Sequence, residues 1–220
     1  MELKQIRSFQ HCKCDKNIFC INLPNVCPFC FETLLTCTFI MPPFCVPSPF
    51  HYHISTLLKF SYTYSAKPIT EYSVVVKPTN GNFLSNYITD DDLHIGLTNS
   101  NGEIYSFSEQ GVVMETDGWD CSLCVPMLTA HDEELMLEWD NQLSKTTNDH
   151  NWSKARYDES AYNCYDYVIS FLSSVLQQSI SKETFCHEHL LPVTERAAKY
   201  ITLYRDLQKN NVIVKNATDS

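Results

Sequence analysis

Cysteines are concentrated at the start of the chain, where seven of the 11 precede residue 46. Two of them, Cys27 and Cys30, have the spacing Cys-x-x-Cys, which presents two thiolates from one tight turn. Residues 1–10 carry no apolar run typical of an export signal, so we expect a cytoplasmic and/or nuclear protein that is not secreted. Thiols in such a reducing compartment bind metal or stay free. The sequence therefore predicts a small zinc-binding module.

A zinc site at Cys27 and Cys30 needs two further ligands. The spacing leaves four candidates open, namely His11, Cys12, Cys14 and Cys20. We favour a zinc-ribbon-like site with one ligand set: Cys12, Cys20, Cys27 and Cys30. The alternative is a group of reduced cysteines without metal.

The prolines between residues 42 and 49 predict a linker after this module. We expect a cysteine-rich module with its linker at 1–48, an arm or strand at 49–69, an α+β domain at 70–215 and a tail at 216–220. Residues 1–69 hold six Lys or Arg against three Asp or Glu, whereas residues 70–220 hold ten against 23. Because an acidic domain repels phosphate, nucleic acid is an unlikely partner, and a nucleic-acid-binding zinc protein ranks third among our hypotheses. No apolar stretch reaches the roughly 20 residues of a membrane span.

The expected domain changes from strand to helix periodicity near residue 130. Alternating, β-branched segments predict strands at 72–76, 93–98, 103–107, 111–114 and 122–128. Apolar residues at helical spacing predict helices at 131–143, 164–177, 182–190 and 194–209. The last helix should pack Tyr200, Ile201, Tyr204 and Leu207 onto the domain. Strands followed by helices indicate an α+β fold with an antiparallel sheet packed by helices.

Cys164 opens one of these helices, and His94 lies on a predicted strand. A helix N-terminus offers unpaired N–H groups and a positive dipole, which lower a thiol pKa and can stabilise an oxyanion. A histidine on a neighbouring strand would be the general base. We expect Cys164 and His94 to face one another across a cleft, with Gly96 leaving room for the helix end.

The order His94-Ile-Gly-Leu, Gly102-Glu-Ile-Tyr-Ser-Phe and Tyr162-Asn-Cys resembles the circularly permuted papain-like fold over residues 72–178. That group includes PPPDE-type isopeptidases and lecithin retinol acyltransferase relatives. The resemblance implies that Cys164 is the nucleophile and His94 the base. It places Ser106 at the third, orienting position.

A second resemblance spans nearly the whole chain. It rests on Phe9-Gln-His-Cys12, Ile18-Phe-Cys20, Cys27-Pro-Phe-Cys30, Asp92-Leu-His-Ile-Gly96, Asn163-Cys-Tyr165 and Lys199-Tyr-Ile-Thr-Leu-Tyr-Arg205. These motifs resemble the makorin opposite-strand family, which has no assigned function.

Two functional hypotheses follow from these residues. The first is a thiol hydrolase or acyltransferase, isopeptidase-like, that uses Cys164 and His94. The alternative is a non-catalytic protein–protein interaction module of the same fold with a structural zinc site. Both imply a protein as substrate or partner.

Overall fold

The computed structural model describes residues 4–11, 14–35, 39–52, 67–89, 91–129 and 131–216. The chain divides into two compact units. Unit 1 comprises Met1–Ser48, Tyr62–Ser65 and Lys199–Ser220, and unit 2 comprises Pro49–Ser61 and Ala66–Ala198. The expected boundary after residue 215 differs from this division, since the C-terminal residues belong with the N-terminal module.

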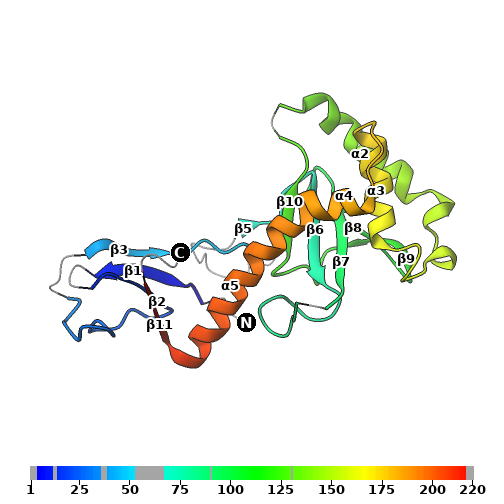
Figure 1. Cartoon of the computed structure of the whole chain (residues 1–220). Helices are drawn as coiled ribbons and strands as arrows, with labels where there is room; N and C mark the ends of the chain where they lie inside the picture. The colour runs from blue at the N-terminus through cyan, green and yellow to red at the C-terminus, as the bar shows by residue number, and fades with distance from the viewer. Residues whose placement is uncertain are drawn as a thin grey trace. The chain divides into compact units, whose positions relative to one another are not determined.

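Unit 1 contains a four-stranded antiparallel sheet (Figure 1). Its strands, in spatial order, are β11 (Val212–Asn216), β2 (Lys16–Cys20), β1 (Arg7–His11) and β3 (Phe39–Cys45). β11 joins this sheet by pairing with β2 over five residues, although about 200 positions separate the two strands along the chain. The buried core of the sheet consists of Phe9, Cys14, Ile18, Cys20 and Cys27.

Part of the proline-rich segment forms a strand in place of the expected linker. Pro42 and Pro43 lie within β3, at a point where the pairing register with β1 shifts. Proline has no N–H to donate to a ladder and is therefore confined to edge strands and bulges. β3 meets both conditions, since it is the last strand of its sheet.

Unit 2 contains a five-stranded antiparallel sheet. The strand order is β10 (Leu123–Pro126), β6 (Ser73–Pro78), β7 (Leu93–Thr98), β8 (Ile104–Ser108) and β9 (Gly111–Glu115). The short strands β4 (His51–Tyr52) and β5 (Lys67–Pro68) pair in parallel beside it.

The helices of unit 2 follow its strands (Figure 1). They are α2 (Glu133–Thr147), α3 (Cys164–Val175) and α4 (Lys182–Phe185), with two short 3₁₀ turns at His150–Trp152 and Lys154–Arg156. A π-helical turn at Cys186–Leu190 joins α4 to α5 (Leu191–Asn210), and the division between the units falls within α5. The predicted mixed architecture of antiparallel sheet and helices is confirmed.

The two faces of the unit 2 sheet are covered by different elements, and Gly96 identifies the face covered by Trp119. A Cβ on Gly96 would lie 2.9 Å from the Tyr105 carbonyl oxygen and 3.2 Å from the Trp119 ring, so any larger residue would clash. The space beside Gly96 is therefore taken by Trp119, and the expectation that a helix end occupies it is not met. Trp119 is 1% exposed and belongs to the core on this face.

The opposite face of the sheet carries α3. Ser106 pairs with Gly96, so its neighbour Phe107 points to the other side. Phe107 contacts Tyr167 of α3, with ring centres 6.3 Å apart. α3 also packs on α2, where the rings of Trp139 and Phe171 meet edge to face at 4.7 Å.

Candidate metal centre and the Cys164 region

Four side chains of unit 1 bring their ligand atoms together within 4.8 Å of one another. They are His11, Cys14, Cys27 and Cys30. The sulfurs of Cys14 and Cys27 are 3.6 Å apart, and the Cys30 sulfur lies 3.3 Å from Nδ1 of His11. Three of the four residues are buried and Cys30 is half-buried. This His/Cys cluster can hold a metal ion.

Two tight turns build the cluster. His11 ends β1, and the backbone N–H of Cys14 donates to the His11 carbonyl in the turn toward β2. The Cys27–Cys30 turn is closed by the N–H of Phe31, which donates to the Cys27 carbonyl at 2.9 Å. Phe31 has a φ of 61°, a left-handed conformation that is costly for a residue with a side chain.

The pKa values of two cluster thiols, Cys14 and Cys27, are shifted in opposite directions. Burial, followed by the neighbouring Cys27 sulfur, raises the pKa of Cys14 to about 12. Burial also acts to raise the pKa of Cys27, but hydrogen bonds from the backbone N–H groups of Cys30 and Phe29 outweigh it and lower the pKa. Nε2 of His11 is buried with no hydrogen-bond partner in the described part of the chain. A bound cation would stabilise the thiolates that burial otherwise disfavours.

The cluster contains two of the four expected ligands, and among the described residues His11 and Cys14 complete it. Cys27 and Cys30 belong to the cluster, whereas Cys12 lies outside the described residues. Cys20 is buried in the core of unit 1 and pairs with Arg7, at the far end of the β1–β2 hairpin from the His11–Cys14 turn. Four residues of strand span roughly 13 Å, too far for Cys20 to reach the cluster. The spacing His-x-x-Cys of His11 and Cys14 was the signal for the two ligands that we did not favour.

Cys164 opens α3, as the sequence predicts, and Asn163 caps the helix. The Asn163 side chain accepts from the Tyr165 N–H at 3.0 Å, and Asp166 accepts from the Asn163 N–H at 2.9 Å, which completes a capping box. Cys164 is 5% exposed. Burial raises its thiol pKa, although hydrogen bonds from the backbone N–H groups of Ile95 and Tyr165 oppose the shift.

His94 packs against Trp119, with ring centres 5.7 Å apart. It shares its side of β7 with Gly96, and strand alternation therefore directs it to the face opposite α3. No hydrogen bond between His94 and Cys164 is found in the described residues. Burial, followed by the Lys77 ammonium, lowers the pKa of His94 to about 4, and Glu115 opposes this shift.

Ser106 is bonded to a carboxylate. Its hydroxyl donates to Oε2 of Glu115 at 2.5 Å, and Nε1 of Trp119 donates to the same oxygen at 3.0 Å. The charge of Glu115 also acts to raise the pKa of His94, and sequence reasoning missed this residue. Nothing in its local pattern distinguishes Glu115 from a solvent-facing residue at the end of a strand.

Acidification is expected to destabilise unit 2 through His94. The imidazole pKa is about 4 in the fold against an ordinary value of 6.5, so the unfolded chain binds more protons between these values. This contribution to stability is complete above pH 6.5 and is lost as the pH falls toward 4; its full size is at most about 3 kcal/mol. Urea unfolding at several pH values measures it, and His94→Gln should flatten the dependence. An unchanged slope in that variant would contradict the assignment.

Comparison with known proteins identifies the family of this chain. The DUF4796 C-terminal family matches residues 57–207. The human MKRN2 opposite strand protein is 30% identical over 215 residues, which cover 96% of this chain and 89% of that protein. The chain belongs to the makorin opposite-strand family. No solved structure matches the chain. Among the helices that the structure describes, none combines the length and apolar character needed to cross a membrane.

Proposed function

We propose that this member of the makorin opposite-strand family is a zinc-stabilised protein-binding protein. His11, Cys14, Cys27 and Cys30 would hold one structural zinc ion in unit 1. The observation that carries the proposal is the convergence of their four ligand atoms within 4.8 Å. Three thiolates and one imidazole form a donor set typical of tetrahedral zinc sites.

A closed set of four protein ligands favours a structural role for the ion. Catalytic zinc sites keep a position open for water or substrate, whereas structural sites fill all four positions with side chains. Metal binding by such a site contributes directly to folding. The small core of unit 1, in which cysteines stand beside Phe9 and Ile18, is consistent with a module that needs this support.

A binding role for unit 2 rests on the state of its thiol and imidazole. The raised pKa of Cys164 and the lowered pKa of His94 leave both groups neutral near pH 7. Nucleophilic thiols depend on a thiolate, usually paired with an imidazolium. Unit 2 also carries eight Lys or Arg against 21 Asp or Glu, an excess of negative charge that suits a basic protein partner.

Replacing a ligand is expected to abolish zinc binding. Cys14→Ala should reduce the zinc content from about one ion per chain to a small fraction, because three remaining ligands hold the ion much less tightly. Cys20→Ala is the matched control, since it removes a buried thiol of unit 1 outside the cluster. Elemental analysis of the purified proteins measures the content. Equal zinc in both variants, or loss in the Cys20 variant alone, would contradict the proposed ligand set.

Thiol hydrolysis through Cys164, in a permuted papain-like fold, is the second candidate. It is favoured by the position of the sulfur at the start of α3, beside the N–H groups of Ile95 and Tyr165. Such donors resemble an oxyanion site.

Labelling with iodoacetamide at pH 7 separates the two candidates. On the binding proposal, the buried Cys164 reacts more slowly than the exposed Cys45, and His94→Ala leaves its rate unchanged. Mass spectrometry of the labelled peptides gives both rates. Preferential labelling of Cys164 that disappears in the His94 variant would support the hydrolase.

A further inference from the structure

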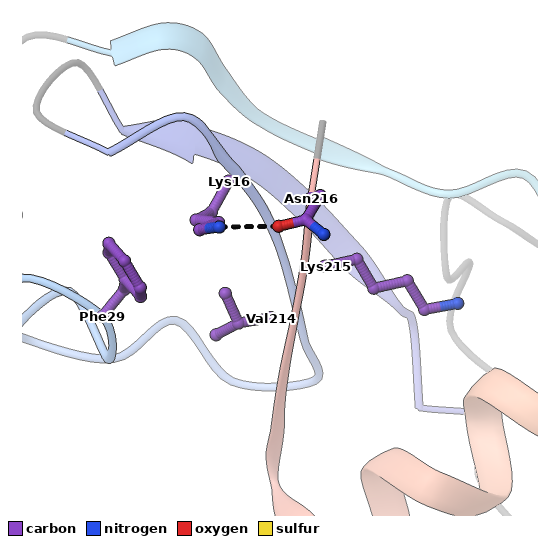
Figure 2. Close-up of a pocket in the computed structure, with 5 residues that line it drawn as sticks. All are labelled: Lys16, Phe29, Val214, Lys215 and Asn216. Atoms are coloured by element: carbon purple, nitrogen blue, oxygen red, sulfur yellow. Dashed lines mark hydrogen bonds between the residues drawn. The ribbon is translucent and has the colours of Figure 1, made fainter. Parts of the chain in front are cut away.

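We propose that a groove in unit 1, between Phe29 and β11, binds an extended acidic segment of a partner protein. The groove has a volume of about 620 Å³ and is lined by Lys16, Phe29, Val214, Lys215 and Asn216 (Figure 2). This inference adds a second binding surface to the function proposed above, located in unit 1 and directed to an acidic segment, and it rests on the zinc-stabilised unit 1 of that proposal.

The metal cluster and the sheet edge supply the two sides of the groove. Phe29 lies in the turn between Cys27 and Cys30, so an ion held by these thiols would fix its position. Val214 pairs with Ile18, and Asn216 pairs with Lys16, which places their side chains on one face of the sheet. Figure 2 shows Phe29 across from Val214 and Lys16.

The lining of the groove combines apolar surface with positive charge. Phe29 is 49% exposed and Val214 is 37% exposed, so an apolar side chain placed between them would bury surface from both. Nζ of Lys16 lies 5.2 Å from the centre of the Phe29 ring and donates to Oδ1 of Asn216 at 2.6 Å. A carboxylate is a stronger acceptor for this ammonium than an amide oxygen.

A second lysine lies on the other face of the same strand. Nζ of Lys215 is 5.9 Å from the centre of the Phe19 ring, and Figure 2 shows its side chain directed away from Phe29. The edge is therefore flanked by a cation on each face. Unit 1 as a whole carries eight Lys or Arg against five Asp or Glu, so acidic residues complement this surface.

The position of β11 favours an extended occupant. Among the strands that the structure describes, β11 is the outermost of its sheet, with β2 as its neighbour. An edge strand offers main-chain donors and acceptors to an added strand, and alternate side chains of that strand then enter pockets on one face. Nucleic acid fits less well, because tracking a phosphate backbone requires a row of cations along one surface, whereas the two lysines of this groove lie over different aromatic rings on opposite faces of the sheet.

Selection from a phage-displayed library of random linear octapeptides on the full, zinc-loaded chain tests the proposal. The enriched peptides should contain acidic and apolar residues at alternate positions. Binding of a synthetic peptide from that set should weaken about tenfold or more with Lys16→Glu and with Phe29→Ala, as loss of a charged contact and of an apolar anchor predicts. Lys145→Glu in unit 2 is the matched charge control and should leave binding unchanged. Circular dichroism checks that each variant is folded.

Three results would overturn the groove proposal: no enriched peptides, peptides insensitive to both Lys16 and Phe29, or Lys16-dependent binding of a fluorescein-labelled oligothymidine in place of peptides. Zinc analysis of the same samples separates this failure from failure of the zinc site. Lys16-dependent peptide binding by a chain without zinc would contradict the structural zinc ion alone. Zinc-loaded chain that selects no peptide would contradict the groove alone.

Discussion

Truncation of the chain after Ala198 is expected to unfold unit 1 while unit 2 keeps its protected core. The deletion removes β11, which pairs with β2 over five residues. It also removes four buried side chains of α5, namely Tyr200, Ile201, Tyr204 and Leu207, each at most 6% exposed. Loss of a large buried side chain costs about 2–5 kcal/mol, against a total stability of about 5–15 kcal/mol for a domain.

Hydrogen exchange with mass spectrometry resolves the two units in this truncation. Amides of β1 and β2 should lose protection, and those of β6 and β7 should retain it. A pair of point variants provides the control: Leu207→Ala removes a fully buried side chain, whereas Gln208→Ala changes its exposed neighbour. Full protection of β2 in the truncated chain would show that α5 and β11 are dispensable for unit 1. Equal effects of the two point variants would show that the buried side of α5 does not stabilise this unit.

Replacing Trp139 is expected to destabilise unit 2 strongly. Trp139 is fully buried, packs against Phe171, and donates from Nε1 to the Thr98 carbonyl at 2.8 Å. Trp139→Ala should lower the free energy of unfolding by about 3–5 kcal/mol, because it leaves a cavity and an unpaired carbonyl. Urea unfolding measures the change.

The control for this substitution lies two residues away on the same helix. Leu137 is 79% exposed, and Leu137→Ala should change stability by no more than about 0.5 kcal/mol. A small loss in the Trp139 variant, or a comparable loss in both, would mean that α2 does not anchor the sheet as described.

Local sequence patterns were sufficient to predict individual strands and helices of the fold. The strand at 93–98 has the predicted bounds, since its apolar residues stand between a polar turn and the Asn99–Gly102 loop. The helix at Cys164 begins where Asn163 supplies a cap and apolar residues recur at helical spacing. The exposed Leu137 shows the limit of this reasoning, because an apolar residue within a predicted helix need not face the core.

The features that could not be predicted from the sequence depend on contacts between residues far apart in the chain. No local signal indicates that β11 adds to β2, since side-chain alternation specifies a strand but not its neighbour. The metal ligands show the same limit: the choice between Cys20 and Cys14 depended on which end of the β1–β2 hairpin faces Cys27. Whether His94 faces α3 likewise depended on which face of the sheet α3 covers. Trp119 occupies the space beside Gly96 where we expected the helix end.

Zinc K-edge X-ray absorption of the purified full chain tests the central claim most directly. The account predicts one zinc ion per chain, surrounded by three sulfurs at about 2.3 Å and one nitrogen at about 2.0 Å. Those ligands correspond to Cys14, Cys27, Cys30 and His11. A chain that folds without zinc, or an ion surrounded by four sulfurs or by oxygen ligands, would contradict it.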